Sequence, residues 1–208
     1  MRILVVSDTH KNLNRFWDVF EKLKRENPVQ IIVHCGDYYE DASAIRMRAG
    51  VPVTAVRGNC DGDFSGESYV ILETEAGDFF VTHGHMENVG HDLQKLCYKA
   101  EEAGCIGAIF GHTHRSAYVL AEDMYLMNPG SLQRPRDGSG GTFGILETGQ
   151  GSVFGKIYRY EDFMSDKGSG GPGGSGKKAQ KPASGRLSRM LNYRDRFCFR
   201  GKLWILKR

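Results

Sequence analysis

The sequence predicts an α/β (α+β) fold in which two β-sheets pack together with helices on the outside. The chain up to residue 56 alternates apolar strand patterns with helical patterns, an order typical of a parallel sheet covered by helices. From residue 69 onward most segments have strand patterns, and we expect those from residue 118 onward to be largely antiparallel. Five strands end in small turns that carry Asp, Asn or His. Open α/β sheets bind ligands at the carboxyl ends of their strands.

The first part of the chain predicts three strands and two helices. Residues 2–6 form an unbroken apolar run, which indicates a strand buried on both faces. Residues 12–26 form an amphipathic helix that ends at Asn27-Pro28. Residues 29–33 and 51–56 are the next strands, and a shorter helix over residues 41–49 lies between them. The apolar stripe of the longer helix consists of Leu13, Phe16, Trp17, Phe20 and Leu23.

The second part of the chain predicts one more helix among several strands. Residues 69–74 and 78–82 are strands joined by a short turn, which is a hairpin signal. Residues 92–103 form a helix that Gly104 ends, and residues 106–110 form the strand that follows. The remaining strand patterns cover residues 118–121, 125–127, 143–147 and 153–160.

The charge distribution predicts a boundary near residue 165. The formal net charge is only +3, but residues 165–208 carry 12 Lys and Arg against 2 Asp and Glu. Residues 1–164 carry 16 against 23. Residues 168–176 contain only Gly, Ser and Pro, which is the composition of a flexible linker. We expect one catalytic domain over residues 1–164, followed by a linker and a basic, disordered tail over residues 165–208.

The basic tail has two interpretations. It is a disordered extension or an expression or frameshift artefact, which we favour because the tail contains no specific motif. Alternatively, it attaches electrostatically to nucleic acid or to an anionic membrane, with Trp204 and its apolar neighbours as the anchor.

The cysteines predict a cytoplasmic protein with reduced thiols. Their number is odd and they form no C-x-x-C pair. The first apolar run is interrupted by Ser7 and Asp8, so the N-terminus does not resemble a signal peptide. No apolar stretch approaches the roughly 20 residues needed to span a bilayer. The five cysteines are Cys35, Cys60, Cys97, Cys105 and Cys198, of which we interpret Cys35, Cys97 and Cys105 as core residues.

Five strand-end turns share one pattern of short apolar strand followed by polar ligand-type residues. Each turn by itself is also compatible with a helix cap or a turn residue. Five that converge favour a metal site, because Asp carboxylates and neutral imidazoles suit Mn, Fe, Ni or Zn. Two such ions, about 3.5–4 Å apart, can share a carboxylate and hold a phosphoryl group between them. The turns are Ser7-Asp8-Thr9-His10, Gly36-Asp37, Gly58-Asn59-Cys60-Asp61, His83-Gly84-His85 and Gly111-His112-Thr113-His114.

This ordered set of motifs resembles the calcineurin-like metallophosphoesterases, and most closely their small bacterial and archaeal phosphodiesterase branch. Asn128-Pro129-Gly130-Ser131, followed by Pro135-Arg136, is similar to the same branch. The resemblance extends from residue 1 to about residue 160. It implies a four-layer αββα sandwich of two mixed β-sheets flanked by helices.

The resemblance also implies a set of metal ligands. Asp8, His10 and His114 would bind the first metal ion, and Asp37 would bridge the two ions. The second metal ion would be bound by Asn59, His83 and His112. A hydroxide between the ions would then attack phosphorus. We expect two divalent ions, with Mn favoured and Ni, Fe or Zn as alternatives.

The catalytic candidates outside the ligand set are Cys60, Asp61 and His85, together with Asn59. Many members of the superfamily have His at the position of Cys60, where it is thought to assist the leaving group. The small branch shares the Cys, so Cys60, His85 and a metal-bound water all stay open as the general acid. His34 and His91 do not sit at strand-end ligand positions, and we interpret both as structural.

The leading functional hypothesis is a metal-dependent phosphodiesterase acting on a small phosphodiester or nucleotide-like substrate. The first alternative is a phosphomonoesterase that uses the same dinuclear site. The second is a non-catalytic interaction scaffold of the same fold, such as the retromer subunit, whose metal site is incomplete. The third is a nucleic-acid-binding protein driven by the basic tail. All seven ligand positions carry competent residues, which favours catalysis.

Overall fold

The computed structural model describes residues 1–62 and 66–166. The linker and basic tail expected from residue 165 therefore lie outside the described residues, except for Ser165 and Asp166. None of the helices in the described part has the length and apolar character that crossing a bilayer requires.

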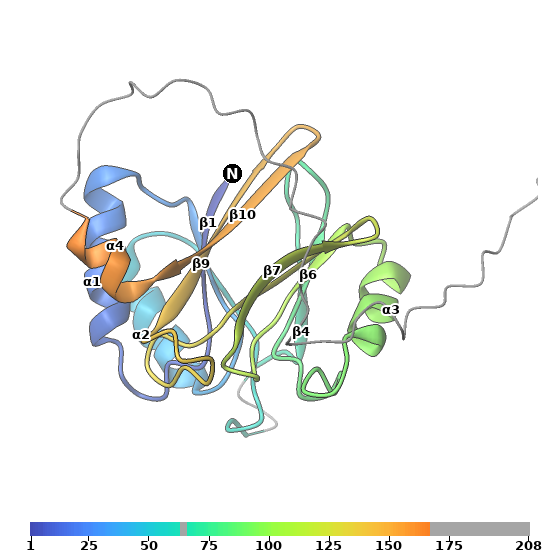
Figure 1. Ribbon diagram of the computed structural model, residues 1–208, viewed down its shortest axis with the longest axis horizontal. Helices are drawn as coiled ribbons and strands as arrows, with labels where there is room; N and C mark the ends of the chain where they lie inside the picture. The colour runs from blue at the N-terminus through green and yellow to red at the C-terminus, as the bar shows by residue number, and fades with distance from the viewer. Residues whose placement is uncertain (63–65, 167–208) are drawn as a thin grey trace, which may run out of the picture. The chain divides into compact units, whose positions relative to one another are not determined.

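Among the described residues, sheet A contains the first three strands and the last two (Figure 1). The strand order is β10-β9-β1-β2-β3. The pairs β1·β2 and β2·β3 are parallel, as the alternating strand and helix patterns predict, whereas β9 pairs antiparallel with both β1 and β10. The bounds are β1 (Arg2–Val6), β2 (Ile31–His34), β3 (Val53–Ala55), β9 (Thr142–Gly149) and β10 (Ser152–Arg159).

Sheet B contains the five strands in the middle of the chain, in the order β4-β5-β6-β8-β7. The predicted hairpin is confirmed as the antiparallel pair β4·β5, and β7·β8 is also antiparallel. The pairs β5·β6 and β6·β8 are parallel, so this sheet is mixed like the first. The bounds are β4 (Tyr69–Leu72), β5 (Phe79–Thr82), β6 (Gly107–Ile109), β7 (Ser116–Ala121) and β8 (Met124–Pro129).

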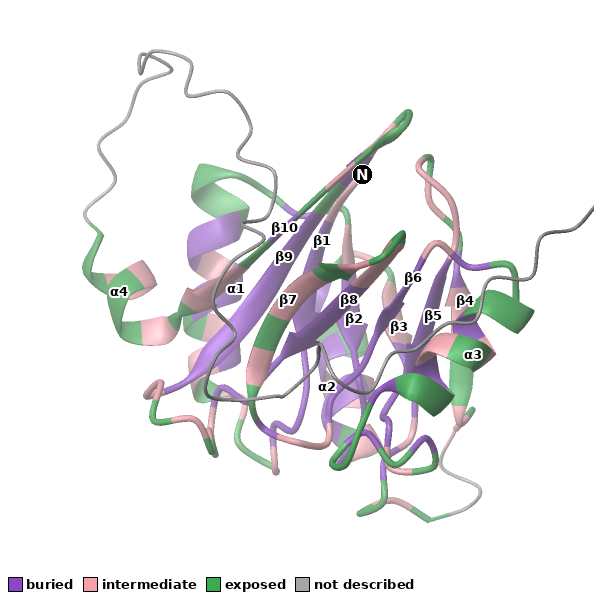
Figure 2. Ribbon diagram, turned by 45° about the vertical axis from the view of Figure 1, so that its right-hand side comes forward, coloured by how far each residue is buried: buried purple, intermediate pink, exposed green. Residues whose placement is uncertain are grey.

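Helices cover the outer faces of the two sheets (Figure 2). Three of them lie on the side of sheet A: α1 (Asn14–Glu26), α2 (Tyr39–Ala49) and α4 (Tyr160–Ser165). Helix α3 (Gln94–Glu102) lies on the side of sheet B. The sequence did not predict α4, because six residues are too few to show a helical period. The last of its residues is Ser165, so this helix crosses the boundary expected after residue 164.

Strand β1 belongs to both hydrophobic cores, which explains its unbroken apolar sequence. Leu4 and Val6 pack with Phe16 and Phe20 of α1 in the core between sheet A and its helices. Ile3 and Val5 point the other way, into the core between the two sheets. Alternate residues of a strand face opposite sides, so a strand with helices on one side and a sheet on the other has no polar face. The four-layer αββα sandwich is thus confirmed.

Candidate metal centre

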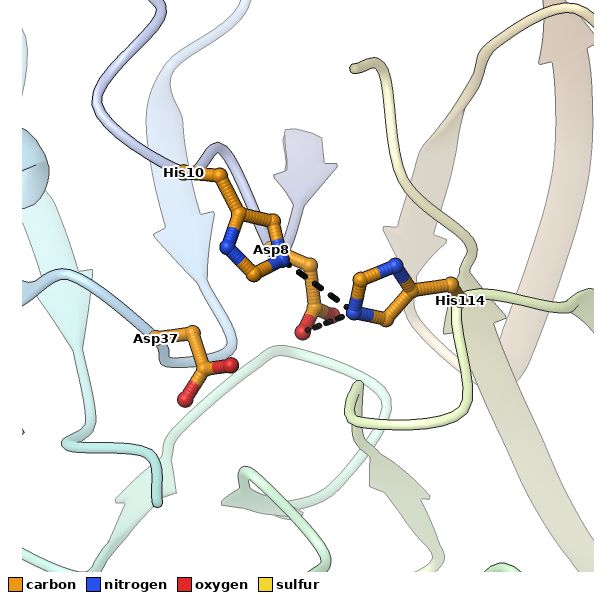
Figure 3. A group of neighbouring side chains, drawn as sticks. All are labelled: Asp8, His10, Asp37 and His114. Atoms are coloured by element: carbon orange, nitrogen blue, oxygen red, sulfur yellow. Dashed lines mark hydrogen bonds and ion pairs between the residues drawn. The ribbon is translucent and has the colours of Figure 1, made fainter. Parts of the chain in front are cut away.

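Four of the predicted ligands come together at the carboxyl ends of β1, β2 and β6 (Figure 3). Asp8 and His10 follow β1, Asp37 follows β2 and His114 follows β6. One ligand atom from each residue lies within 4.8 Å of those of the other three. We call Asp8, His10, Asp37 and His114 the first half-site.

The first half-site brings hydrogen-bond acceptors face to face. The Nδ1 of His114 lies 2.7 Å from the backbone oxygen of Arg134, so Nδ1 carries the hydrogen and donates it. In a neutral ring this leaves a lone pair on Nε2, which lies 3.1 Å from Asp8 Oδ1 and 3.2 Å from His10 Nε2. Asp8 Oδ1 is buried, and a neutral His114 gives it no donor. A cation satisfies all three atoms, so the residues fit a metal ion.

The pKa values of His114 and Asp8 are shifted in opposite directions. Burial lowers the pKa of His114, but the hydrogen bond to Asp8 and its charge outweigh burial and raise that pKa. Burial raises the pKa of Asp8, but the hydrogen bonds from His114 and Ser7 and the charge of His83 outweigh it and lower that pKa. A divalent ion bound here would supply positive charge beside the same two groups.

Asn59, His83 and His112 form the second half-site, and His83 shows the same arrangement. The Nδ1 of His83 lies 2.7 Å from the backbone oxygen of Cys35 and donates to it. Its Nε2 therefore faces Asn59 Oδ1 at 3.1 Å and Asp37 Oδ1 at 3.3 Å. The ring of His112 lies beside the ring of His83, with 5.2 Å between centroids. Asp37 thus touches both half-sites, as a bridging ligand must.

The remaining imidazoles near the site are biased toward their neutral, metal-binding form. Burial lowers the pKa of His10, and the neighbouring positive charge of His114 lowers it further. Burial likewise lowers the pKa of His112, with His83 as the next contribution. A neutral imidazole offers a nitrogen lone pair, which is what a metal ligand needs.

Backbone strain is concentrated in the ligand turns. Seven of the nine non-glycine residues with positive φ among the described residues lie there, each at a cost of about 1–3 kcal/mol. Asp and His adopt positive φ more often than most non-glycine residues, but a turn sequence alone does not show which of its residues will do so. The seven residues are Asp8, His10, Lys11, Asp37, Tyr38, His112 and His114.

Polar residues that the sequence did not single out as functional fix these turns. The hydroxyl of Ser7 donates to Asp8 Oδ2 at 2.6 Å, and the backbone N–H of His112 donates to the same oxygen at 3.1 Å. Ser131 Oγ donates to the backbone oxygen of Asp8 at 2.8 Å, and Asn128 Nδ2 donates to that of Gly111. The Asn-Pro-Gly-Ser segment, noted in the sequence as similar to the small branch, therefore supports two of the three turns of the first half-site, those after β1 and β6.

The three catalytic candidates outside the ligand set occupy different surroundings. Both carboxylate oxygens of Asp61 accept backbone N–H groups, from Tyr39 and from Gly58, each at 2.8 Å. Asp61 therefore holds the turn that carries Asn59. Its catalytic role stays a prediction.

Cys60 and His85 both lie beside the ligands. Cys60 is exposed, its N–H donates to Asp37 Oδ1 at 3.0 Å, and burial together with Asp37 raises the pKa of its thiol to about 11. The ring of His85 lies 5.3 Å from that of His83, and its Nδ1 is buried without a hydrogen-bond partner among the described residues. Burial and then His83 lower the pKa of His85.

The sequence matches one protein family over most of its length. Residues 1–151 match the family described as the calcineurin-like phosphoesterase superfamily domain. The probable metallophosphoesterase YsnB of Bacillus subtilis is 34% identical over 138 residues, which are 65% of this chain and 78% of that protein. Phosphodiesterase MJ0936 of Methanocaldococcus jannaschii is 28% identical over 170 residues, which are 71% of this chain and 93% of that protein.

Solved structures show the same fold. Zinc-bound Vps29 of Entamoeba histolytica superimposes with a TM-score of 0.59 over 77% of this chain and 99% of that one. The sequence identity of this pair is 19%, so the likeness concerns the fold alone.

Proposed function

This chain belongs to the calcineurin-like phosphoesterase superfamily, and from that premise we propose that it is a phosphodiesterase dependent on two divalent metal ions. The substrate in this proposal is a small phosphodiester, such as a nucleotide-like one, and water is the nucleophile. When bound, the two ions supply an activated nucleophile and neutralise charge on the phosphoryl oxygens. The donor set of carboxylate, imidazole and amide groups suits Mn²⁺, with Fe, Ni and Zn as alternatives.

Each ligand has a distinct task in this proposal. Asp8, His10 and His114 bind the first ion, and Asp37 is shared between the two ions. The second ion is bound by Asn59, His83 and His112. The main-chain carbonyls of Cys35 and Arg134 orient His83 and His114, so that both rings present Nε2 to the metals.

The single observation that supports the proposal best is that, in each half-site, a histidine nitrogen lies opposite a carboxylate oxygen, so that two hydrogen-bond acceptors face each other. His114 Nε2 faces Asp8 Oδ1, and His83 Nε2 faces Asp37 Oδ1. Neither arrangement is stable for neutral rings unless a cation lies between the acceptors. Because Asp37 takes part in both, the pair of ions would be close enough to hold one phosphoryl group.

Metal analysis combined with a substrate panel tests the proposal. The purified protein is stripped of metal, reloaded with Mn²⁺, and assayed on bis-p-nitrophenyl phosphate and on p-nitrophenyl phosphate. We expect about two ions per chain and a higher kcat/KM for the diester. A higher kcat/KM for the monoester would replace the proposal by its first alternative, a phosphomonoesterase. Two bound ions with no hydrolysis of either compound would favour the scaffold alternative.

A second experiment identifies the group that protonates the leaving oxygen. We propose His85 and Cys60 as the two side chains in position for this step. A p-nitrophenolate leaves without protonation, whereas an alkoxide needs a proton, and a positioned acid contributes about 10²–10⁴-fold. His85→Gln and Cys60→Ser are each compared on aryl and alkyl diesters. The variant that slows the alkyl substrate selectively identifies the acid, and an equal effect on both substrates assigns the step to water.

A further inference from the structure

Three polar side chains lie behind the first half-site, and none of them belongs to the predicted ligand set. Thr9 and His34 are completely buried, and Asp41 is 7% exposed. Thr9 Oγ1 lies 2.6 Å from Asp41 Oδ2 and 2.9 Å from His34 Nε2. On the other side of the ring, His34 Nδ1 lies 3.3 Å from the backbone nitrogen of Gly36. We call Thr9, His34 and Asp41 the buried triad.

Every hydrogen in the buried triad can be assigned. A carboxylate has no hydrogen to give, so the hydroxyl of Thr9 donates to Asp41. The oxygen of Thr9 must then accept, so His34 carries its hydrogen on Nε2 and donates it to Thr9. His34 Nδ1 is left with a lone pair, which accepts the N–H of Gly36. The triad therefore has one consistent arrangement, with a neutral ring and every close contact satisfied.

The buried triad connects the two turns that carry the aspartate ligands. Thr9 lies between Asp8 and His10, and Gly36 directly precedes Asp37. Asp41 Oδ2 also accepts the backbone N–H of Lys11 at 2.9 Å. The backbones of the two turns are joined as well, because Asp8 N donates to the oxygen of Gly36 at 3.1 Å. His10, Lys11 and Asp37 have positive φ, which is held only when the surroundings impose it.

We propose that Thr9, His34 and Asp41 are positioning residues that hold the Asp8–His10 turn and the Asp37 turn in metal-binding register before any metal ion arrives. This inference rests on the proposed function, since it concerns the same metal site. Thr9 is the central member, because its one hydroxyl links the ring of His34 to the carboxylate of Asp41. Outer partners of this kind typically contribute about 10- to 100-fold to metal affinity.

The matched pair Thr9→Val and Thr9→Ser tests the proposal. Valine keeps the shape of threonine and removes the hydroxyl, whereas serine keeps the hydroxyl. Mn²⁺ binding is measured by calorimetry, and the frozen-solution EPR spectrum reports whether two Mn²⁺ ions are magnetically coupled. We expect Thr9→Val to bind Mn²⁺ about 10- to 100-fold more weakly and to lose the coupled spectrum. Thr9→Ser retains both properties.

Thr148→Val is the control for a merely structural loss. The hydroxyl of Thr148 also donates to a carboxylate, Glu75 Oε2 at 2.9 Å, but Thr148 lies in β9 next to the amino end of β1. We expect this variant to lose thermal stability without a change in Mn²⁺ affinity or in the EPR spectrum. If Thr9→Val binds two coupled Mn²⁺ ions as tightly as the parent, or if Thr148→Val loses them equally, the proposal is wrong.

Two further measurements keep the proposal testable if Thr9→Val does not fold. Asp41→Leu removes the acceptor and Asp41→Asn keeps an oxygen that can accept both bonds, so only the leucine variant should weaken Mn²⁺ binding. In the metal-free parent protein, ¹⁵N NMR of the His34 ring should show hydrogen on Nε2 and none on Nδ1. The opposite tautomer would overturn the assignment. Both readouts are independent of hydrolysis, so inactivity on phosphodiesters would count against the proposed function and not against the triad.

Discussion

The two half-sites of the metal centre are held in different ways. In the first, Asp8 and Asp37 are almost completely buried, and Ser7 and the buried triad fix their turns from behind. In the second, His83 is completely buried and donates to a main-chain carbonyl, as His114 does in the first, but Asn59 is exposed and His112 is only half-buried. The aspartates of the first half-site are therefore held like core residues, whereas the second half-site is open at Asn59 and His112. A hydrolytic site needs both, because one part must define the metal position and the other must admit substrate.

The largest expected effect comes from removing the ligand that both half-sites share. Asp37→Asn should bring the metal content below one ion per chain and lower kcat/KM for a diester on the order of 10³-fold, equivalent to about 4 kcal/mol. His112→Asn removes a ligand from the open half-site only, so this variant should keep one tightly bound ion. Metal analysis and steady-state kinetics measure both. Equal metal loss in the two variants would mean that the half-sites are not independent, and unchanged hydrolysis in Asp37→Asn would remove the catalytic proposal.

The buried triad gives the support behind the first half-site a pH dependence of its own. Burial lowers the pKa of His34 from 6.5 to about 4. Between these values the unfolded chain binds a proton that the folded protein does not, so stability falls as pH decreases through this window. The total loss is about 3 kcal/mol. Denaturant unfolding of the metal-free protein at pH 6.5 and pH 4.5 measures this loss, and in His34→Gln the decrease should be smaller. Parallel pH curves for the two proteins would contradict the assignment.

The sequence indicates the positions of the predicted ligands, but it does not indicate the buried triad that lies behind them. Asp8, Asp37, His83 and His112 can be predicted as ligands from the sequence, because each lies in a polar turn directly after an apolar strand. His34 also follows an apolar run, but its pairing with Thr9 and Asp41 depends on the parallel register of β1 and β2, which brings Val6 opposite His34. Side-chain hydrogen bonds across two turns and a helix have no local sequence signal. The same reason explains why the sequence does not show that Asp61 accepts the backbone N–H groups of Tyr39 and Gly58.

The close packing of Gly111 against Ser7 and Asp8 predicts a third, smaller effect on stability and metal binding. A Cβ atom on Gly111 would lie 2.0 Å from Ser7 Oγ and 2.9 Å from Asp8 Oδ2. Gly111→Ala should therefore displace Asp8, reduce stability by about 2 kcal/mol and weaken Mn²⁺ binding. Gly90 lies in the open loop after His85, and a Cβ there would meet nothing within 4 Å. Gly90→Ala is the matched control and should leave the melting temperature and Mn²⁺ affinity unchanged; a loss as large as that of Gly111→Ala would refute the packing explanation.

The smallest effect concerns the ion pair between Glu87 and Lys99, beside the loop that carries His85. Glu87 follows His85 closely, its side chain is 2% exposed, and it accepts from Thr82 Oγ1 and from Lys99 Nζ of α3. The side chain of Lys99 is 38% exposed, so water screens part of its interaction with Glu87. We therefore expect Lys99→Met to lower the free energy of unfolding by about 1 kcal/mol. Lys95, on the same helix, donates to the backbone oxygen of Met86 in the same loop.

Lys95→Met therefore removes a contact to the same loop without leaving a buried charge behind. We expect it to lower the melting temperature less than Lys99→Met does, and to leave amide hydrogen exchange over residues 84–91 close to that of the parent. Faster exchange in Lys99→Met alone would show that a buried carboxylate, rather than helix contact as such, orders the loop that carries His85. If both variants change the melting temperature and the amide exchange equally, α3 supports the loop only by packing. The ion pair between Lys99 and Glu87 would then not order the loop.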